Sequence, residues 1–213
     1  PEVGARRGAL VVAGADEPDE ALAAVGGRAE SLQWPMMLCV AEPAFARRLE
    51  PEVLRRLELL RRERVDVVTL MVEDPAELKS GGMLQVLFDL RARGTFGELG
   101  LAHGDVRSAE WLALHTAARA LGLPWSLADQ SARYRAAAAA SEHGMTCFAW
   151  QRGTTAEAAA FALGDAARVL PVFDIVLPDD VKPMSAADVD QRWMAYAAGH
   201  GEPERLPRST PPE

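Results

Sequence analysis

The chain alternates short, continuously apolar runs with longer stretches in which apolar residues recur every three or four positions. A continuous apolar run is typical of a parallel strand covered on both faces, because neither face then carries polar side chains. The runs predict seven strands, at Ala9–Ala13, Met36–Ala41, Val65–Val72, Glu98–Ala102, Trp125–Ala128, Met145–Trp150 and Phe173–Leu177. Seven strand-then-helix units favour a (β/α) barrel over an open doubly wound sheet.

Helical spacing fills the intervals between these strands. One predicted helix has Pro51 in its first turn and an apolar face made of Val53, Leu54, Leu57 and Leu60. A second is expected from Ser108 to Leu121, ended by Gly122 and followed by Pro124. The run Ala136–Ala140 favours a helix by propensity alone.

Charge and cysteine content narrow the class of protein. The 213 residues carry a formal net charge of −8 and are 49% hydrophobic, which indicates a globular domain and argues against nucleic acid as a partner. The basic residues near the second helix stand beside glutamates and are interpreted as a solvated face; they are Arg55, Arg56, Arg61, Arg62 and Arg64. Cys39 and Cys147 lie in apolar runs and are interpreted as buried apolar side chains.

No apolar run approaches the ~18 residues that cross a bilayer, so no membrane insertion is expected. Two cysteines in apolar runs are compatible with a reducing intracellular compartment. We expect the cytoplasm, or an organelle entered after removal of a transit peptide.

Several motifs occur in an order that resembles one known family. They are Ala9–Glu20, Met36–Glu42, Val65–Pro75, Leu90–His103 and His143–Trp150. In order and spacing they resemble the strand-end motifs of aldo-keto reductases, beginning at that family's second barrel strand. The resemblance implies an incomplete TIM-type (β/α) barrel of about seven parallel strands over residues 1–198, which lacks the family's first βα unit. Residues 199–213 are expected to form an extended arm.

The resemblance also implies which positions would carry the family's chemistry, a hydride transfer from NADPH assisted by a tyrosine. The positions of its Asp, Tyr, Lys and His fall on Val11, Asp16, Ala41 and Met71. A tyrosine gives up its proton near neutral pH only when neighbouring charges lower its pKa. These four positions hold neither the tyrosine nor the lysine and histidine that would supply such an environment, so none of the residues can replace its counterpart. Reduction of carbonyls is therefore not expected.

The cofactor positions are changed as well. Gln130 and Trp150 are the remaining candidates for contacts to a nicotinamide, as vestiges of that site. Asp179 and Asp180 stand where the family holds a phosphate, and two carboxylates repel a phosphate. We expect no cofactor and no metal.

One group of polar residues remains at the expected carboxyl ends of the strands. Glu42, Glu73, His103 and Asp129 form a mostly acidic set that could supply acid/base or metal-assisted chemistry. The alternative is that these residues begin the helices that follow, where carboxylates are favoured.

The leading hypothesis is a non-catalytic protein that serves as an accessory, structural or regulatory subunit of a larger assembly. A barrel that lacks one strand exposes two edges, near Leu10 and Ile175, and exposed edges recruit partners. A protein partner or a second copy is therefore expected. The rival hypotheses are an enzyme that uses the acidic set and a small-molecule binding protein that uses the former cofactor cleft.

Overall fold

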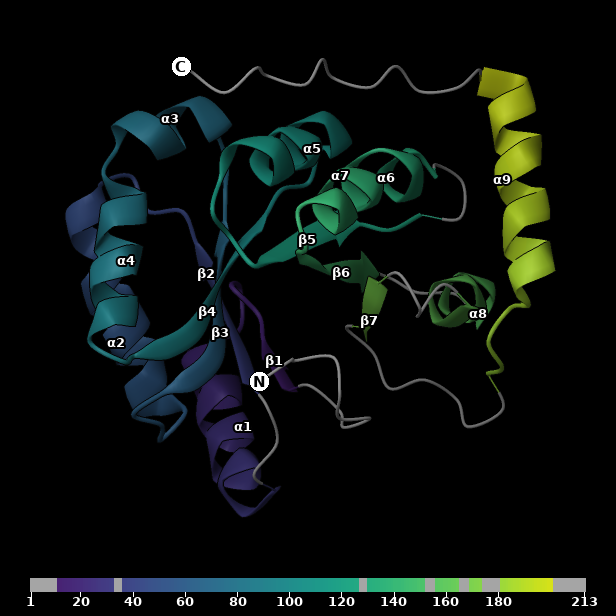
Figure 1. The fold of residues 1–213 in the computed structure, drawn as a ribbon. Coiled ribbons are helices and arrows are strands. Elements are labelled where there is room, and N and C mark those ends of the chain that lie inside the picture. Colours follow the sequence, from purple (N-terminus) through teal and green to yellow (C-terminus); the bar gives the residue numbers. More distant parts are fainter. Residues whose placement is uncertain are drawn as a thin grey trace. The chain divides into compact units, whose positions relative to one another are not determined.

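The computed structural model describes residues 11–32, 36–126, 130–151, 156–164, 169–173 and 181–200. These residues form α/β structure in two compact units, residues 1–100 and 101–213 (Figure 1). The strands follow chain order, from β1 to β7. Among the described residues, no helix is both long enough and apolar enough to cross a membrane.

The first unit alternates strands and helices and ends within β4. Its elements are β1 (Val11–Ala13), α1 (Asp19–Leu32), β2 (Met36–Ala41), the 3-10 helix η1 (Ala46–Arg48), α2 (Leu49–Leu59), β3 (Val65–Met71), α3 (Pro75–Ser80), α4 (Met83–Ala92) and β4 (Phe96–Ala102). β1 pairs with β2 and β2 pairs with β3, both in parallel. The predicted β2 is confirmed, and the predicted β3 is one residue too long.

The second unit continues the alternation with parallel pairing of β5 with β6 and of β6 with β7. Its elements are α5 (Val106–His115), β5 (Ala120–Pro124), α6 (Ser131–Tyr134), α7 (Ala136–Glu142), β6 (Thr146–Gln151), α8 (Ala156–Gly164), β7 (Val169–Phe173) and α9 (Ala186–His200). α7 confirms the helix that the alanine run predicts.

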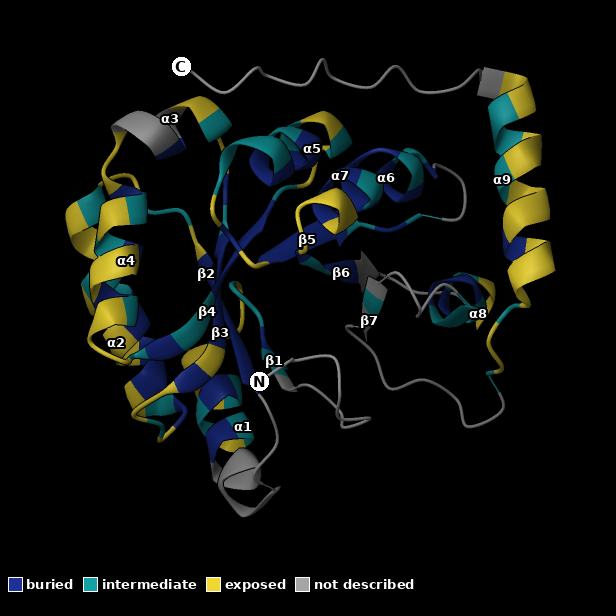
Figure 2. Ribbon diagram, in the orientation of Figure 1, coloured by how far each residue is buried: buried dark blue, intermediate teal, exposed yellow. Residues whose placement is uncertain are grey.

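The core follows the apolar runs. Every side chain of β2 from Met36 to Val40 is buried, as is most of β3 (Figure 2). Cys39 and Cys147 are both buried free thiols, which confirms their interpretation as apolar side chains. Burial raises the pKa of each thiol to about 12, so neither is a nucleophile near neutral pH.

The prediction of a helix from Ser108 to Leu121 is wrong beyond His115. Thr116 has extended backbone, and its hydroxyl donates to the Leu112 carbonyl at 2.7 Å, which closes α5. Ala120–Pro124 form β5 instead, and Gly122 lies opposite Phe148 within the sheet. A short buried strand and a buried helical turn give the same apolar pattern, so periodicity could not separate them.

Two other predicted strands shift along the chain. The strand predicted over Trp125–Ala128 is replaced by the earlier β5, with Leu127 and Ala128 outside the described residues. β7 shares only Phe173 with the strand predicted over Phe173–Leu177, and residues 174–177 lie outside the described part of the chain. α9 extends to His200, and the remainder of the expected arm is likewise outside it.

The predicted apolar face of α2 is buried at Val53, Leu57 and Leu60, whereas Leu54 is 44% exposed. Leu49, at the start of the helix, is buried as well. Arg56 is buried in the same stripe, which corrects its interpretation as part of a solvated face. The reason lies in the contacts of its guanidinium, described below.

A close approach of α1 to the end of α2 requires a glycine. A Cβ added to Gly26 would lie 2.6 Å from both the carbonyl carbon and the oxygen of Leu60. We expect Gly26→Ala to destabilise the protein by about 1–3 kcal/mol, because backbone atoms must move to admit the methyl group. The measurement is urea denaturation followed by circular dichroism.

The sign of this effect makes the test sharp. In an unobstructed helix, replacing glycine with alanine stabilises by about 1 kcal/mol. The matched control is Gly104→Ala, at a loop glycine whose added Cβ would meet nothing within 4 Å. A Gly26→Ala variant as stable as the wild type would show that the helices do not approach this closely.

Candidate functional site

The carboxyl ends of β1, β2 and β3 lie in the first unit, and two of the four positions that the resemblance marks for chemistry meet there. Ala41 and Met71 are register partners at the last residues of β2 and β3. The pairing continues one residue further, since the Glu42 N–H donates to the Met71 carbonyl at 3.1 Å. Neither side chain of this pair can exchange a proton.

The other two positions lie at β1. Val11 is the first residue of β1 and pairs with Met36, at the amino end of β2. Asp16 is exposed in the turn that follows β1. Of the four positions that the resemblance marks, only Asp16 has a side chain that can exchange a proton, and it lies in the turn after β1.

Glu42 and Glu73, two members of the predicted acidic set, are in contact. Glu42 Oε2 accepts hydrogen bonds from the backbone N–H of Glu73 at 2.6 Å and of Asp74 at 3.4 Å. Asp74 in turn accepts from the Ala76 N–H at 2.8 Å, at the start of α3. Glu42 therefore contacts the backbone of Glu73 and not its carboxylate. The other carboxylate oxygen of Glu42, Oε1, is buried without a hydrogen-bond partner.

His103 follows β4 and belongs to the second unit. Its Nδ1 accepts a hydrogen bond from the Asp105 N–H at 2.8 Å. Asp105 caps α5, because its Oδ2 accepts from the Ser108 N–H at 2.8 Å. Burial alone would raise the pKa of Asp105, but hydrogen bonds from Ser108 and from the Arg107 backbone outweigh it and lower the pKa.

The predicted set is therefore only partly assembled in the described structure. Glu42 and Glu73 meet, His103 is engaged with its own helix start, and Asp129 lies outside the described residues. Within those residues, no three His, Cys, Asp or Glu side chains are grouped so that they could hold a metal ion.

The vestigial cofactor candidates have different surroundings. The Gln130 side chain is 2% exposed, and both its Oε1 and its Nε2 are buried without a hydrogen-bond partner. It stands at the N-terminus of α6, beyond β5. Trp125, which directly follows β5, has a buried indole N–H in the same condition. Trp150 lies in β6, and its side chain is outside the described residues.

Sequence analysis missed the contacts of Arg56. Its Nε donates to Glu52 Oε1 at 2.7 Å and its Nη1 to the Gly14 carbonyl at 2.8 Å. A further hydrogen bond joins Nη2 to the Ala15 carbonyl. The buried guanidinium therefore fixes the turn that follows β1. A signal was present, since position 56 continues the stripe of Leu49, Val53 and Leu60.

A second buried arginine was also missed. In the second unit Arg135 Nε donates to Glu110 Oε2 at 2.7 Å, and both side chains are less than a tenth exposed. The pair joins α5 to the start of α7. Nothing in the local spacing of either residue indicates this contact.

The contacts of Arg56 predict an acid-sensitive contribution to stability. Hydrogen bonds from Arg55, and then from Arg56, hold the pKa of Glu52 below its ordinary value of 4.5, although burial opposes them. A carboxylate with a lowered folded-state pKa stabilises fully above the unfolded pKa, and this stabilisation is lost as pH falls through the folded pKa. We expect Glu52→Gln to cost about 1–2 kcal/mol at neutral pH and progressively less below pH 4.5.

The measurement is chemical denaturation of both proteins across this pH range. Glu58→Gln is the control, because Glu58 is an exposed glutamate of the same helix. A constant stability difference between wild type and Glu52→Gln at all pH values would contradict the assigned role of the charge.

Comparisons with known proteins show similarity in structure. No protein-family model and no curated protein matches the sequence. A putative aldo-keto reductase from Pseudomonas aeruginosa matches with a TM-score of 0.66 at 17% identity, over 78% of this chain and 72% of that one.

Two further solved structures are similar. The holo form of the aldo-keto reductase AKR11C1 from Bacillus halodurans matches with a TM-score of 0.69 at 9% identity, over 87% of this chain and 81% of that one. An aldo-keto reductase from Klebsiella pneumoniae in complex with NADP and acetate matches with a TM-score of 0.60 at 14% identity, over 93% and 82%.

Identities this low show a shared fold and not a shared activity. The expected fold class is confirmed: the chain has an α/β fold of parallel strands that matches an incomplete (β/α) barrel of the aldo-keto reductase kind.

Proposed function

We propose that this chain, with its aldo-keto-reductase-type fold, does not reduce carbonyls and acts as an accessory or regulatory subunit of a larger protein assembly. The observation that carries the proposal is the register of β2 on β3, which sets Ala41 beside Met71. The resemblance implies a lysine and a histidine at these two positions. An alanine and a methionine neither hold a charge near a tyrosine nor deliver a proton.

The hydrogen bonds around these strand ends support the same proposal. Glu42 accepts from the backbone of Glu73, and Asp105 accepts from the backbone of Ser108. Both carboxylates thus contribute to the starts of helices. Oxygen atoms that accept from the backbone in this way stabilise the fold.

The test combines recovery of partners with an activity assay on the full chain. We expect the chain, tagged and purified at its native abundance after mild cross-linking, to be recovered in a complex of fixed stoichiometry with another protein. We expect the purified chain to reduce no generic aldehyde in the presence of NADPH. Recovery as a monomer alone, or turnover proportional to the amount of protein, would overturn the proposal.

A second function, small-molecule binding in the former cofactor cleft, is favoured by Gln130. A buried amide with no hydrogen-bond partner costs about 1–3 kcal/mol, which a polar ligand would recover. Native mass spectrometry distinguishes the two functions. A retained organic ligand that is lost in Gln130→Leu supports binding, whereas a ligand-free wild type that Gln130→Leu stabilises argues against it.

The enzyme hypothesis for Glu42, Glu73, His103 and Asp129 has one observation in its favour, the buried Oε1 of Glu42. A metal retained by the wild-type chain and lost in Glu42→Gln, measured by elemental analysis after dialysis, would support it. A metal content that is the same in both proteins removes this role for Glu42.

A further inference from the structure

The C-terminal helix α9 is attached to the second unit by a narrow face. Among its described side chains only Val189 is buried, and Met194 is 70% exposed. By contrast, α5 buries Ala109, Leu112 and Ala113 within a shorter helix. The free energy of local opening comes mainly from buried apolar contacts. It is therefore expected to be lower for α9 than for α5.

The residues that α9 contributes to its ion pairs are exposed to solvent. Asp190 Oδ1 accepts from Arg133 Nη2 at 2.7 Å, with 62% of the Asp190 side chain and 8% of the Arg133 side chain exposed. Arg192 pairs with Glu157 of α8, and both side chains are about half exposed. Water and salt screen such pairs, so they add little to the attachment of the helix.

Aromatic rings also attach α9 to α6. The Trp193 ring stacks on the Tyr134 ring of α6, with centroids 4.9 Å apart and an interplanar angle of 15°. The Tyr196 ring lies 5.6 Å from the Trp193 ring, measured between centroids. Asp190 and Trp193 are three positions apart in α9 and therefore share a face, which meets the consecutive residues Arg133 and Tyr134.

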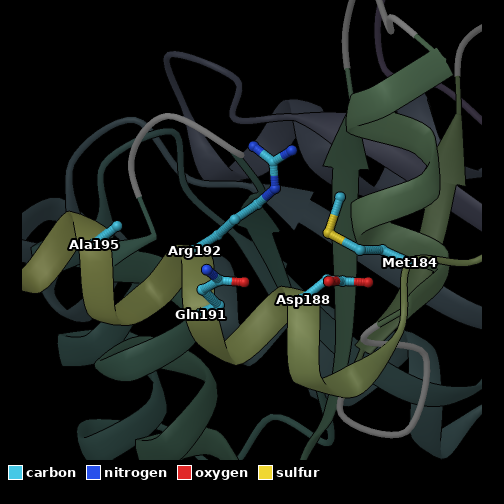
Figure 3. Close-up of a pocket in the computed structure, with 5 residues that line it drawn as sticks. All are labelled: Met184, Asp188, Gln191, Arg192 and Ala195. Carbon is cyan, nitrogen blue, oxygen red and sulfur yellow. The ribbon is translucent and has the colours of Figure 1, made fainter.

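The flank of α9 borders an open surface pocket of about 430 Å³ (Figure 3). It is lined by Met184 of the preceding segment and by four exposed residues of α9, which are Asp188, Gln191, Arg192 and Ala195. This side of α9 therefore faces solvent and adds nothing to the buried contacts of the helix.

We infer that α9 is a displaceable strap, and that the α6 surface it covers, made by Arg133 and Tyr134, is the docking site for a partner helix. The partner helix carries a carboxylate followed three positions later by an aromatic ring, as Asp190 and Trp193 do in α9. Charge complementarity supports this occupant, because the Arg133 side chain is nearly buried while its partner carboxylate, Asp190, remains mostly exposed to water. A partner that shields its carboxylate from water against Arg133 forms a stronger charge-assisted hydrogen bond with the guanidinium than the exposed Asp190 does.

This inference rests on the proposed function, since it assigns the surface and the chemistry of the partner. Its first test uses the wild-type chain and hydrogen exchange read by mass spectrometry. We expect the amides of α9 to exchange at least about tenfold faster than those of α5 under native conditions, which corresponds to a lower opening free energy. Equal protection of the two helices would overturn the strap.

The second test measures binding of a labelled peptide that contains residues 186–200 to the full chain. We expect the Asp190→Ala, Trp193→Ala double variant to bind the peptide about tenfold more tightly than the wild type does, because its own α9 competes less. Met194→Ala, on the exposed face of α9, is the control and is expected to bind as the wild type does. Equal binding by the double variant and the wild type would refute the docking site.

A third variant covers the case in which the double variant fails to fold. Val189→Ala shortens the one buried side chain among the described residues of α9 and leaves Arg133 and Tyr134 untouched, so it is also expected to bind the peptide more tightly than the wild type. A peptide that carries the two alanine substitutions is expected to bind none of these proteins; equal binding of this peptide would count against recognition by Arg133 and Tyr134.

The peptide experiment needs no partner, so its failure is separable from that of the proposed function. A partner that is recovered at native abundance and is not released by excess peptide would remove this docking site and leave the accessory role intact. Tight binding of the peptide to a chain that is recovered as a monomer would support the strap and remove the accessory role.

Discussion

The buried guanidinium of Arg56 is the interaction on which the first unit depends. It joins α2 to the carbonyls of Gly14 and Ala15 while it is paired with Glu52. An arginine cannot lose its charge within a protein, so any arrangement that removes these acceptors leaves an uncompensated buried cation. The turn after β1, which leads to Asp16, is consequently fixed by structural contacts.

The same use of polar groups recurs at the carboxyl ends of later strands. Glu42 serves the backbone before α3, and Asp105 serves the first turn of α5. In barrels of this fold class the carboxyl ends of the strands carry the active site. Here Glu42 Oε2 and Asp105 accept from backbone N–H groups, and the paired positions Ala41 and Met71 have side chains without an ionisable proton. This arrangement supports the proposed accessory role.

Much of the fold was predictable because strand position and burial follow from local apolar runs, as the confirmed β2 shows, and because alanine favours helix, as α7 shows. Where a local pattern was ambiguous, prediction failed: Ala118 and Leu121 fit a helical stripe, yet both are buried at or next to β5. Contacts between residues far apart in the sequence could not be predicted. The pairing of Glu110 with Arg135 depends on how α5 meets α7, and the burial of Gln130 depends on its surroundings after β5. At the site, residue types at the strand ends could be read from the sequence, but their engagement with backbone could not.

The proposed function implies that the strand ends do not form a nicotinamide cofactor site. Thermal unfolding of the full chain with increasing NADPH or NADH measures this directly, since a ligand that binds the folded state at a hundredfold excess over its Kd stabilises by about 2.7 kcal/mol. We expect an unfolding midpoint that does not change with either nucleotide. A midpoint that rises with nucleotide concentration as expected for a single site would contradict it.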